Sequence, residues 1–396
     1  MRTTDGAGGP ETEPMLGRSL KGWSAIPGWI ASLTMIALTT FWTYWGIAEM
    51  YHEGWWGAWV NRLPYLAPVA VCLVPTLAAF RWPIVGGAVI VAFGIFGGWF
   101  FANIAIIFAA MVGIGALFIV HGILLRRSAH PDGGADSSPT RTAETTNSDT
   151  EAVDTLNQPR RRQPAASAPG PSPWWRRNLR FVLALGLPFL TTVGVSAANL
   201  PIVLTRIDNG DRSAQLIKGN GLTLVWAPEG PGWNYRQPWG GYPSWQAVAL
   251  YGVEPVGFDD KPGYGRRADR TIFATAADMT ATQLCRYLSE DGTEIQDTVQ
   301  DIWRMPTTDE IVRSLARHGH NAGCRWDGNV PVPVDCEIRP DKESPLWSTD
   351  SPAIYYWTAD EGGERDGVFV SYNGWVNATY KLGGNPRHSY RCVRDP

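Results

Sequence analysis

The stretch PGWIASLTMIALTTFWTYWGI, residues 27–47, contains no Asp, Glu, Lys or Arg. It is long enough to cross the hydrocarbon core of a bilayer, which takes roughly 20 residues of α-helix. A helix satisfies its own backbone hydrogen bonds, which is the condition for spanning a membrane. The sequence therefore predicts a transmembrane helix over this stretch.

Four further apolar runs follow, at residues 66–80, 84–100, 104–125 and 181–200. Arg81 and Pro83 separate the first two of these, as expected where a short helical hairpin turns. The last run contains Pro188, which a membrane helix tolerates when its neighbours satisfy the freed carbonyl. We therefore predict an all-α bundle of four spans at 26–125 and a fifth transmembrane helix at 179–200.

Basic residues near the span ends predict the orientation, because cytoplasmic loops carry an excess of Lys and Arg. The segment 126–178 has few large aliphatic residues and is rich in arginine, so we expect a disordered basic linker in the cytoplasm. Counting spans backward places the tail 1–25 in the cytoplasm too, and residues 201–396 outside it. The predicted location is the plasma membrane, with the lipid bilayer as the first partner.

Residues 219–396 alternate short strand-like runs with Gly, Pro, Asn and Asp turns, which predicts an α+β domain. One helix is expected at Met279–Ser289, with Asp278 as its cap. A second is expected to begin at Thr307 or Thr308 and to run to about Arg317. The expected strands are at residues 222–226, 353–358, 368–372, 375–380 and 390–393.

Four of the 5 cysteines lie in the exported domain, at Cys285, Cys324, Cys336 and Cys392, and four cysteines permit three pairings. Cys72 is alone in the second span. An exported domain folds in an oxidising compartment, where cysteines pair. We therefore expect two disulfides, while the residues alone leave the pairing open.

The titratable side chains give little indication of a metal site, a proton site or a transport pathway. Glu49, His52 and Glu53 lie together just after the first span, where a metal or proton site is conceivable, but a solvated loop is the simpler interpretation. His318 and His320 are two residues apart and do not share a helix face. We find no charged residue facing a pathway within the spans, so transport has no support there. No metal and no cofactor are expected.

The run 226–245 is rich in aromatic residues within a Gly- and Pro-containing segment, a composition suited to a contact surface for a peptide or glycan. Packing of these rings in the core, under long loops, is the alternative. The predicted ligand surface consists of Trp226, Trp233, Tyr235, Trp239, Tyr242 and Trp245.

Four sequence words in the exported domain are distinctive together: ATQLCRYL at 281–288, WRMPT at 303–307, YW at 356–357 and YRCVR at 390–394. With these words the region 219–396 resembles the C-type-lectin-like fold, in its bacterial formylglycine-generating-enzyme-like and adhesin-domain branch. The resemblance implies a bridge between the first helix and the last strand, joining Cys285 to Cys392, which leaves Cys324 with Cys336. The four-span segment looks like a bacterial four-helix membrane domain, a likeness that implies no function.

This fold hosts oxidases, sugar binders and protein-binding modules, so function must be argued from residues. Formylglycine-generating enzymes bind copper through two neighbouring cysteines near the C-terminus, whereas this chain has only Cys392 there, with His388 and Arg391 around it. Calcium-dependent sugar binders carry Glu-Pro-Asn or Gln-Pro-Asp, whereas Gln237 and Pro238 are followed by Trp239.

The leading prediction is therefore a membrane-anchored extracytoplasmic binding or sensing module without catalytic residues. Its expected ligand is an extracytoplasmic protein, peptide or glycan, and not a nucleic acid. One alternative is an oxidoreductase of the formylglycine-generating type. Another is a transport or assembly subunit whose lectin-like domain captures a ligand.

Overall fold

The computed structural model describes residues 22–53, 55, 59–100, 105–129, 178–233, 244–252, 273–383 and 387–396. The chain divides into two compact units, Met1–Gly46 with Leu66–Val193 and Ile47–Tyr65 with Gly194–Pro396. The C-terminal domain therefore shares its unit with the connection between the first two long helices. Nearly all of the predicted linker and of the N-terminal tail lies outside the described residues.

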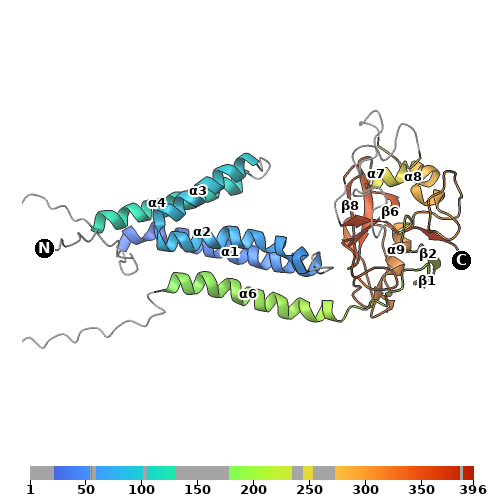
Figure 1. Cartoon of the computed structure of the whole chain (residues 1–396), viewed down its shortest axis with the longest axis horizontal. Coiled ribbons are helices and arrows are strands. Elements are labelled where there is room, and N and C mark those ends of the chain that lie inside the picture. Colours follow the sequence, from blue (N-terminus) through green and yellow to red (C-terminus); the bar gives the residue numbers. More distant parts are fainter. Residues whose placement is uncertain are drawn as a thin grey trace, which may run out of the picture. The chain divides into compact units, whose positions relative to one another are not determined.

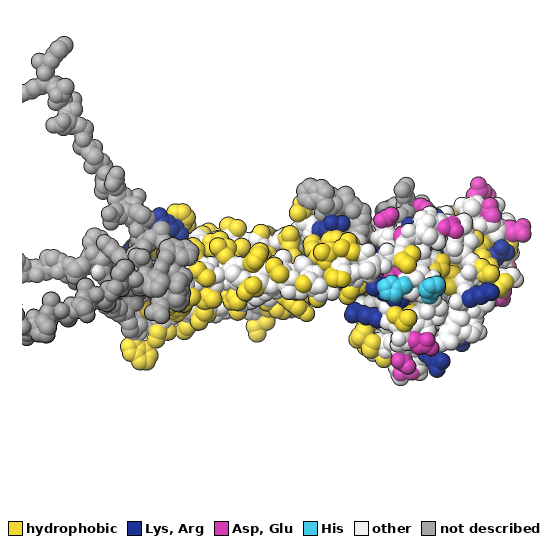
Figure 2. Space-filling model, turned by 90° about the horizontal axis from the view of Figure 1, so that it is seen from below, with side chains coloured by type: hydrophobic (Ala, Val, Ile, Leu, Met, Phe, Trp, Pro, Cys, Tyr) yellow, Lys and Arg dark blue, Asp and Glu magenta, His cyan; other side chains and the backbone are white. Residues whose placement is uncertain are grey.

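Five helices in the described part of the chain are long and apolar enough to cross a membrane (Figure 1). Each coincides with one predicted run, and Figure 2 shows hydrophobic side chains over the helical part. Three of the helices continue four or five residues beyond the predicted C-terminal ends, because hydropathy marks only the apolar stretch of a helix. Their bounds are α1 (Ile26–His52), α2 (Ala67–Arg81), α3 (Pro83–Phe100), α4 (Ala105–Ala129) and α6 (Leu179–Leu204).

Glycines let α3 and α4 pack closely. A Cβ atom added to Gly87 would lie 2.7 Å from the carbonyl oxygen of Gly115, and one added to Gly115 would lie 2.6 Å from that of Gly87. A Cβ atom added to Gly94 would likewise lie 2.9 Å from the carbonyl oxygen of Phe108. Small residues at such contacts allow two helix backbones to approach within van der Waals distance. Any larger residue at Gly87 or Gly115 would separate the pair.

Two sheets and a short hairpin form the C-terminal domain. The first sheet has the order β1 (Gln215–Lys218), β2 (Thr223–Trp226), β10 (Val393–Arg394), so the last strand pairs with one of the first, antiparallel. The hairpin joins β3 (Ala316–Arg317) to β4 (His320–Asn321). The second sheet has the order β5 (Val332–Pro333), β8 (Trp375–Tyr380), β7 (Asp366–Ser371), β6 (Tyr355–Glu361), β9 (His388–Ser389).

The strand predictions are largely confirmed, since β2, β6, β7 and β8 lie at the expected places. The predicted last strand at 390–393 is wrong in its bounds. The chain there forms two short strands, β9 and β10, each of which pairs in a different sheet. The short strand β1 and the helix α7 (Trp245–Ala249) were not predicted.

The first predicted helix of the domain is interrupted. It consists of α8 (Ala276–Thr282) and a 3-10 turn, η4 (Leu284–Tyr287), because Gln283 between them is extended. Its side-chain oxygen accepts a hydrogen bond from the Met305 amide, a long-range contact that local sequence does not reveal. The cap is Thr275 rather than Asp278, although Asp278 completes a reciprocal capping box with it.

The second predicted helix, α9 (Thr308–Ser314), begins as expected. Thr307 is its N-cap, and the Glu310 side chain bonds back to the Thr307 amide. The helix ends earlier than predicted, because Leu315 leaves the helical conformation and Ala316 begins β3.

The core of the domain consists of two clusters of buried side chains. One contains Trp226, Trp233, Trp347 and Tyr356, and the rings of Trp347 and Tyr356 are stacked at 3.7 Å between centroids. The other is built around Trp245, Trp303, Trp357 and Tyr390. Large aromatic rings bury more apolar area than any other side chains, so these residues dominate the stability of the domain.

Arg391 lies at the junction of the two clusters and is 0% exposed. Its Nε atom donates to the carbonyl of Ala227 at 2.9 Å, and its Nη1 atom donates to those of Pro345 and Leu346 at 2.7 and 2.9 Å. The guanidinium carbon is 3.6 Å from the centroid of the Trp233 ring, a cation–π contact. Burial lowers the pKa of Arg391 to about 9, so the group is still a cation at neutral pH.

The four cysteines of the domain are in the two pairs that the resemblance implies. Cys285 in η4 is bonded to Cys392 just before β10, and Cys324 is bonded to Cys336. The two bridges close loops with sequence separations of 107 and 12. In the chain-entropy model such loops correspond to about 5 and about 3 kcal/mol of stabilisation, so the long bridge contributes more. Cys72, in α2, is the free cysteine.

We predict that replacing Arg391 destabilises the C-terminal domain by about 3 kcal/mol or more. Arg391→Ala removes the donor from two buried carbonyls and one partly buried carbonyl, and it removes a cation–π contact. Arg391→Lys should restore little of the lost stability, because an ammonium group cannot donate in the fixed directions of a guanidinium. Urea unfolding of the detergent-solubilised chain, followed by tryptophan fluorescence, measures the change.

The matched control for this prediction is Arg325→Lys, at an exposed position. It should change the free energy of unfolding by less than about 0.5 kcal/mol. Equal stability of Arg391→Lys and the unmodified chain would show that charge alone matters at residue 391.

Candidate functional site: a histidine and two glutamates at the end of α1

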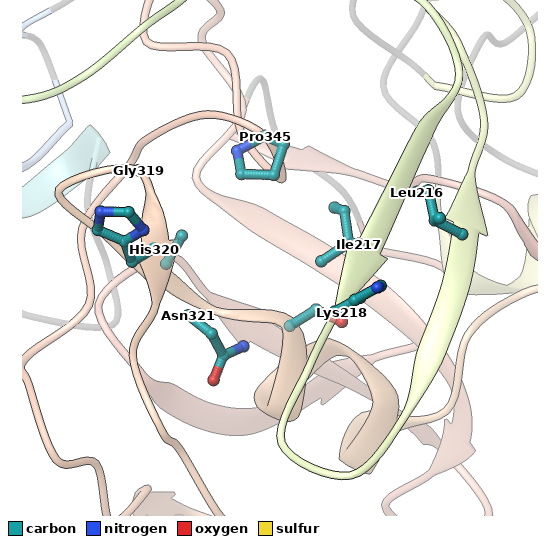
Figure 3. Close-up of a pocket in the computed structure, with 9 residues that line it drawn as sticks. Leu216, Ile217, Lys218, Gly319, His320, Asn321 and Pro345 are labelled. Carbon is teal, nitrogen blue, oxygen red and sulfur yellow. The ribbon is translucent and has the colours of Figure 1, made fainter.

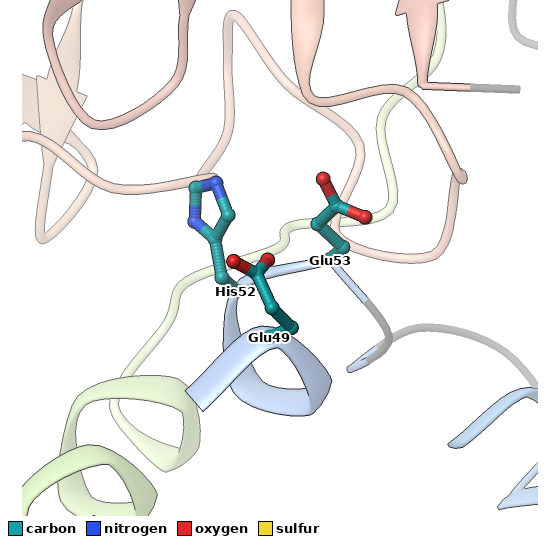
Figure 4. Close-up of side chains that lie close together, drawn as sticks. All are labelled: Glu49, His52 and Glu53. Atoms are coloured by element: carbon teal, nitrogen blue, oxygen red, sulfur yellow. The ribbon is translucent and has the colours of Figure 1, made fainter. Parts of the chain in front are cut away.

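The clearest cluster of chemically active side chains is at the C-terminal end of α1, in the connection that belongs to the unit of the C-terminal domain. Glu49, His52 and Glu53 are spaced so that they share one helix face. The Glu53 amide donates to the Glu49 carbonyl at 2.7 Å, which continues the helical pattern. Potential ligand atoms of the three side chains lie within 4.8 Å of one another (Figure 4). The three residues thus form a compact site and not a dispersed loop.

Tyr372 of the C-terminal domain holds the imidazole. The Nδ1 atom of His52 lies 2.8 Å from the Tyr372 hydroxyl, which also donates to the His52 carbonyl at 3.3 Å. Tyr372 is buried in the core of the domain, and burial raises its pKa, so the phenol stays protonated. The orientation of the histidine ring is therefore set by a rigid neighbour.

Two tyrosines and one arginine surround the Glu53 carboxylate. The hydroxyls of Tyr65 and Tyr355 each lie 3.4 Å from one of its oxygens. The Nε atom of Arg387 is 3.5 Å from Glu53, and its guanidinium also donates to the Tyr65 hydroxyl. Arg387 offsets one of the two negative charges that Glu49 and Glu53 bring together.

The spacing in the sequence predicts that the three residues lie together, but the simpler interpretation from the sequence was a solvated loop. Glu49 and His52 lie instead in the last turn of α1, and all three side chains are only partly exposed. Their partners Tyr355, Tyr372 and Arg387 are about 300 residues away along the chain, at separations of 302 for Tyr355 and 320 for Tyr372. The spacing of Glu49, His52 and Glu53 was the only local signal of this site.

The segment that follows α6 is fastened to the same domain by buried ion pairs. Asp341 bonds to Arg206 at 2.9 Å and to Arg317 at 2.6 Å, and its side chain is only 4% exposed. Arg317 also reaches the hydroxyl of Thr205 at 3.2 Å and the carboxylate of Glu343 at 3.1 Å. Removing one member of such a buried network leaves an uncompensated charge, which is why these contacts hold the chain firmly.

A second feature is a small pocket between β1 and the β3–β4 hairpin (Figure 3). Its volume is about 230 Å³, below the range of roughly 300 to 1,000 Å³ that is usual for small-molecule sites. The hydroxyl of Ser314, buried and without a hydrogen-bond partner, is part of the lining. A water molecule would satisfy that hydroxyl, so the pocket does not call for an organic ligand. The lining residues are Leu216, Ile217, Lys218, Ser314, Ala316, Gly319, His320, Asn321 and Pro345.

The predicted aromatic ligand surface needs correction. Trp226, Trp233 and Trp245 are 0%, 2% and 0% exposed and belong to the core clusters, so they have no free face for a ligand. The indole nitrogens of Trp233 and Trp245 donate to the Tyr356 hydroxyl and the Thr358 carbonyl, which lets these rings be buried. The other three members, Tyr235, Trp239 and Tyr242, lie outside the described residues.

The other histidines named above lie in two places, His388 in the core and His318 and His320 in the β3–β4 hairpin. His388 is 6% exposed, and its ring is stacked on Trp357 at 4.5 Å between centroids. The rings of Tyr355 and Phe369 lie 5.0 and 5.1 Å from it, so His388 is a core residue. His318 and His320 are exposed in the β3–β4 hairpin, where His318 adopts a left-handed backbone conformation with φ of 53°.

No family model matches the sequence, and no curated protein or solved structure matches the chain. The C-type-lectin-like resemblance therefore stays a prediction. The observed α+β domain with two disulfides is compatible with it but does not identify a family. The function must be argued from the geometry of this chain.

We predict that His388 makes the domain sensitive to acid. Burial lowers its pKa from 6.5 to about 4. Between pH 6.5 and 4, His388 is protonated in the unfolded chain but not in the folded domain. The contribution of neutral His388 to the free energy of unfolding is therefore complete above pH 6.5 and declines as the pH falls to 4. The loss should amount to about 3 kcal/mol.

His388→Phe keeps an aromatic ring in the stack. In this variant the free energy of urea unfolding, plotted against pH between 7 and 4, should lose the slope that His388 causes. His320→Gln, at an exposed histidine, should retain the slope. An unchanged slope in His388→Phe would assign the acid sensitivity to other groups.

Proposed function

We propose that the chain is a membrane-anchored extracytoplasmic binding or sensing module. Its C-type-lectin-like domain, residues 219–396, would bind a protein, peptide or glycan outside the cytoplasm. The observation that carries the proposal is the pairing of all four cysteines of this domain in disulfides, which persist in oxidising compartments. The five apolar helices support membrane attachment.

The paired cysteines weigh against the oxidoreductase alternative. Copper chemistry of the formylglycine-generating type needs thiolates, and Cys392 is bonded to Cys285 with both side chains 0% exposed. A thiolate site there would first require this buried disulfide to be reduced. Binding by surface complementarity needs no such step.

The contacts of the domain with the ends of two helices support the sensing role. α1 ends at His52, and His52 and the following Glu53 contact Tyr372, Tyr355 and Arg387 of the domain. α6 continues into a segment held by the buried carboxylate of Asp341. A rearrangement of the domain on binding would therefore change contacts at two helices that also belong to the helical part of the chain.

The proposal predicts the topology. In a Cys72→Ala background, a membrane-impermeant maleimide applied to intact cells should label Thr298→Cys, which is exposed in the C-terminal domain. It should label Ser128→Cys, exposed at the end of α4, only after the cells are permeabilised. The Cys72→Ala protein without an added cysteine should not be labelled before or after permeabilisation, because its remaining cysteines are paired. Labelling of position 128 in intact cells would contradict the orientation.

The binding role predicts retention of a ligand without thiol chemistry. The detergent-solubilised chain, treated with a thiol-alkylating reagent and a copper chelator, should still bind saturably to a member of an array of glycans and peptides. Alkylation should modify Cys72 alone. Copper-dependent consumption of a cysteine-containing peptide, or alkylation of Cys285 or Cys392 in the native chain, would favour the oxidoreductase instead.

A further inference from the structure

We propose that Glu49, His52 and Glu53 bind a divalent transition-metal ion such as Zn²⁺. From the sequence we expected no metal. The geometry of the end of α1 points to one, because it adds an oriented imidazole to two carboxylates on the same helical turn.

The hydrogen bonds of His52 leave one ring nitrogen available for a metal. The Tyr372 hydroxyl has a single proton, and the arrangement that satisfies both of its contacts with His52 donates this proton to the His52 carbonyl. The short contact between that hydroxyl and Nδ1, at 2.8 Å, is then a bond in which Nδ1 donates. In this tautomer the Nε2 atom carries a lone pair, as a metal ligand requires. Histidine ligands in metalloproteins commonly donate their second nitrogen to an oxygen in this way.

The two carboxylates supply charge that a cation would neutralise. Glu49 and Glu53 are adjacent on one helix face, and like charges so close repel one another. Arg387 lies 3.5 Å from Glu53 and offsets one of the two negative charges. A divalent ion between the carboxylates would remove their mutual repulsion.

The spacing of the ligand atoms suits one ion after a small adjustment. Zinc binds nitrogen and oxygen at about 2 Å, so two of its ligand atoms can be at most about 4 Å apart. The ligand atoms here lie within 4.8 Å of one another. Rotation about the flexible side-chain bonds of Glu49 and Glu53 can close the difference, while Tyr372 keeps the imidazole in place.

The ligand set selects the class of metal. One imidazole and two carboxylates suit Zn²⁺, Mn²⁺ or Fe²⁺. Ca²⁺ requires six to eight oxygen ligands, and Mg²⁺ prefers oxygen and retains its waters, so neither suits a histidine-containing set of three. Three protein ligands also leave a position open for water, as in zinc sites that bind an exchangeable ligand.

The test uses the full chain in detergent, purified without a histidine tag and treated with a chelator. Co²⁺, which mimics Zn²⁺ but absorbs visible light, should bind with one ion per chain and be displaced by Zn²⁺. Glu49→Gln, Glu53→Gln and His52→Gln each remove one ligand and should weaken binding by more than about 100-fold. His320→Gln, which alters an exposed histidine elsewhere, should leave the affinity unchanged.

Tyr372→Phe separates the proposed geometry from simple charge attraction. Tyr372 would be a positioning residue, since its hydroxyl bonds to Nδ1 and to the backbone carbonyl of His52 and not to the nitrogen that would bind the metal. Its replacement should weaken Co²⁺ binding by about 10- to 100-fold while the visible spectrum keeps its shape. His52→Gln should change the spectrum, because a nitrogen ligand is lost.

Tryptophan fluorescence and intact disulfides show for each variant that the domain is folded. Absence of a stoichiometric Co²⁺ or Zn²⁺ site in the folded chain would overturn the proposal. So would full affinity in His52→Gln, or a loss in His320→Gln as large as in the ligand variants, which would indicate binding to surface histidines.

Discussion

The C-terminal domain depends on one buried cation. Arg391 joins the carbonyls of Ala227, Pro345 and Leu346, and its guanidinium lies against the ring of Trp233. An isolated charge in such a core would be very costly, so each of these contacts is needed to keep it there. Because Cys392 follows directly and is bonded to Cys285, the same short segment also places the long disulfide and β10.

Polar contacts attach the ends of α1 and α6 to this domain. Asp341 and Glu343 hold the chain after α6 through two arginines, and tyrosines and Arg387 surround the end of α1. Hydrogen bonds and ion pairs of this kind weaken steeply when their distances and angles change. This dependence suits the sensing role that we propose, because a small movement of the domain would alter contacts at both helix ends.

The proposed function and the proposed metal site are separate but compatible. Because the cysteines of the domain are paired in disulfides, we propose recognition at the domain surface and not thiol chemistry. The histidine and the two glutamates lie at the place where α1 meets tyrosines of that domain. A metal ion bound there would add a further bond to the end of α1, and its open coordination position would face an exchangeable ligand.

Local patterns in the sequence determined the apolar helices, the Thr307 cap of α9 and most strands, because hydropathy, capping and alternation act between neighbouring residues. The tertiary structure decided what depends on distant partners. Trp226, Trp233 and Trp245 looked suited to a ligand surface, yet packing against strands far along the chain buries them. Met305 holds the extended Gln283 that interrupts a predicted helix, and Tyr372 orients His52. Those partners come together only when the chain folds, which is why spacing alone could suggest the site at the end of α1 but not its geometry.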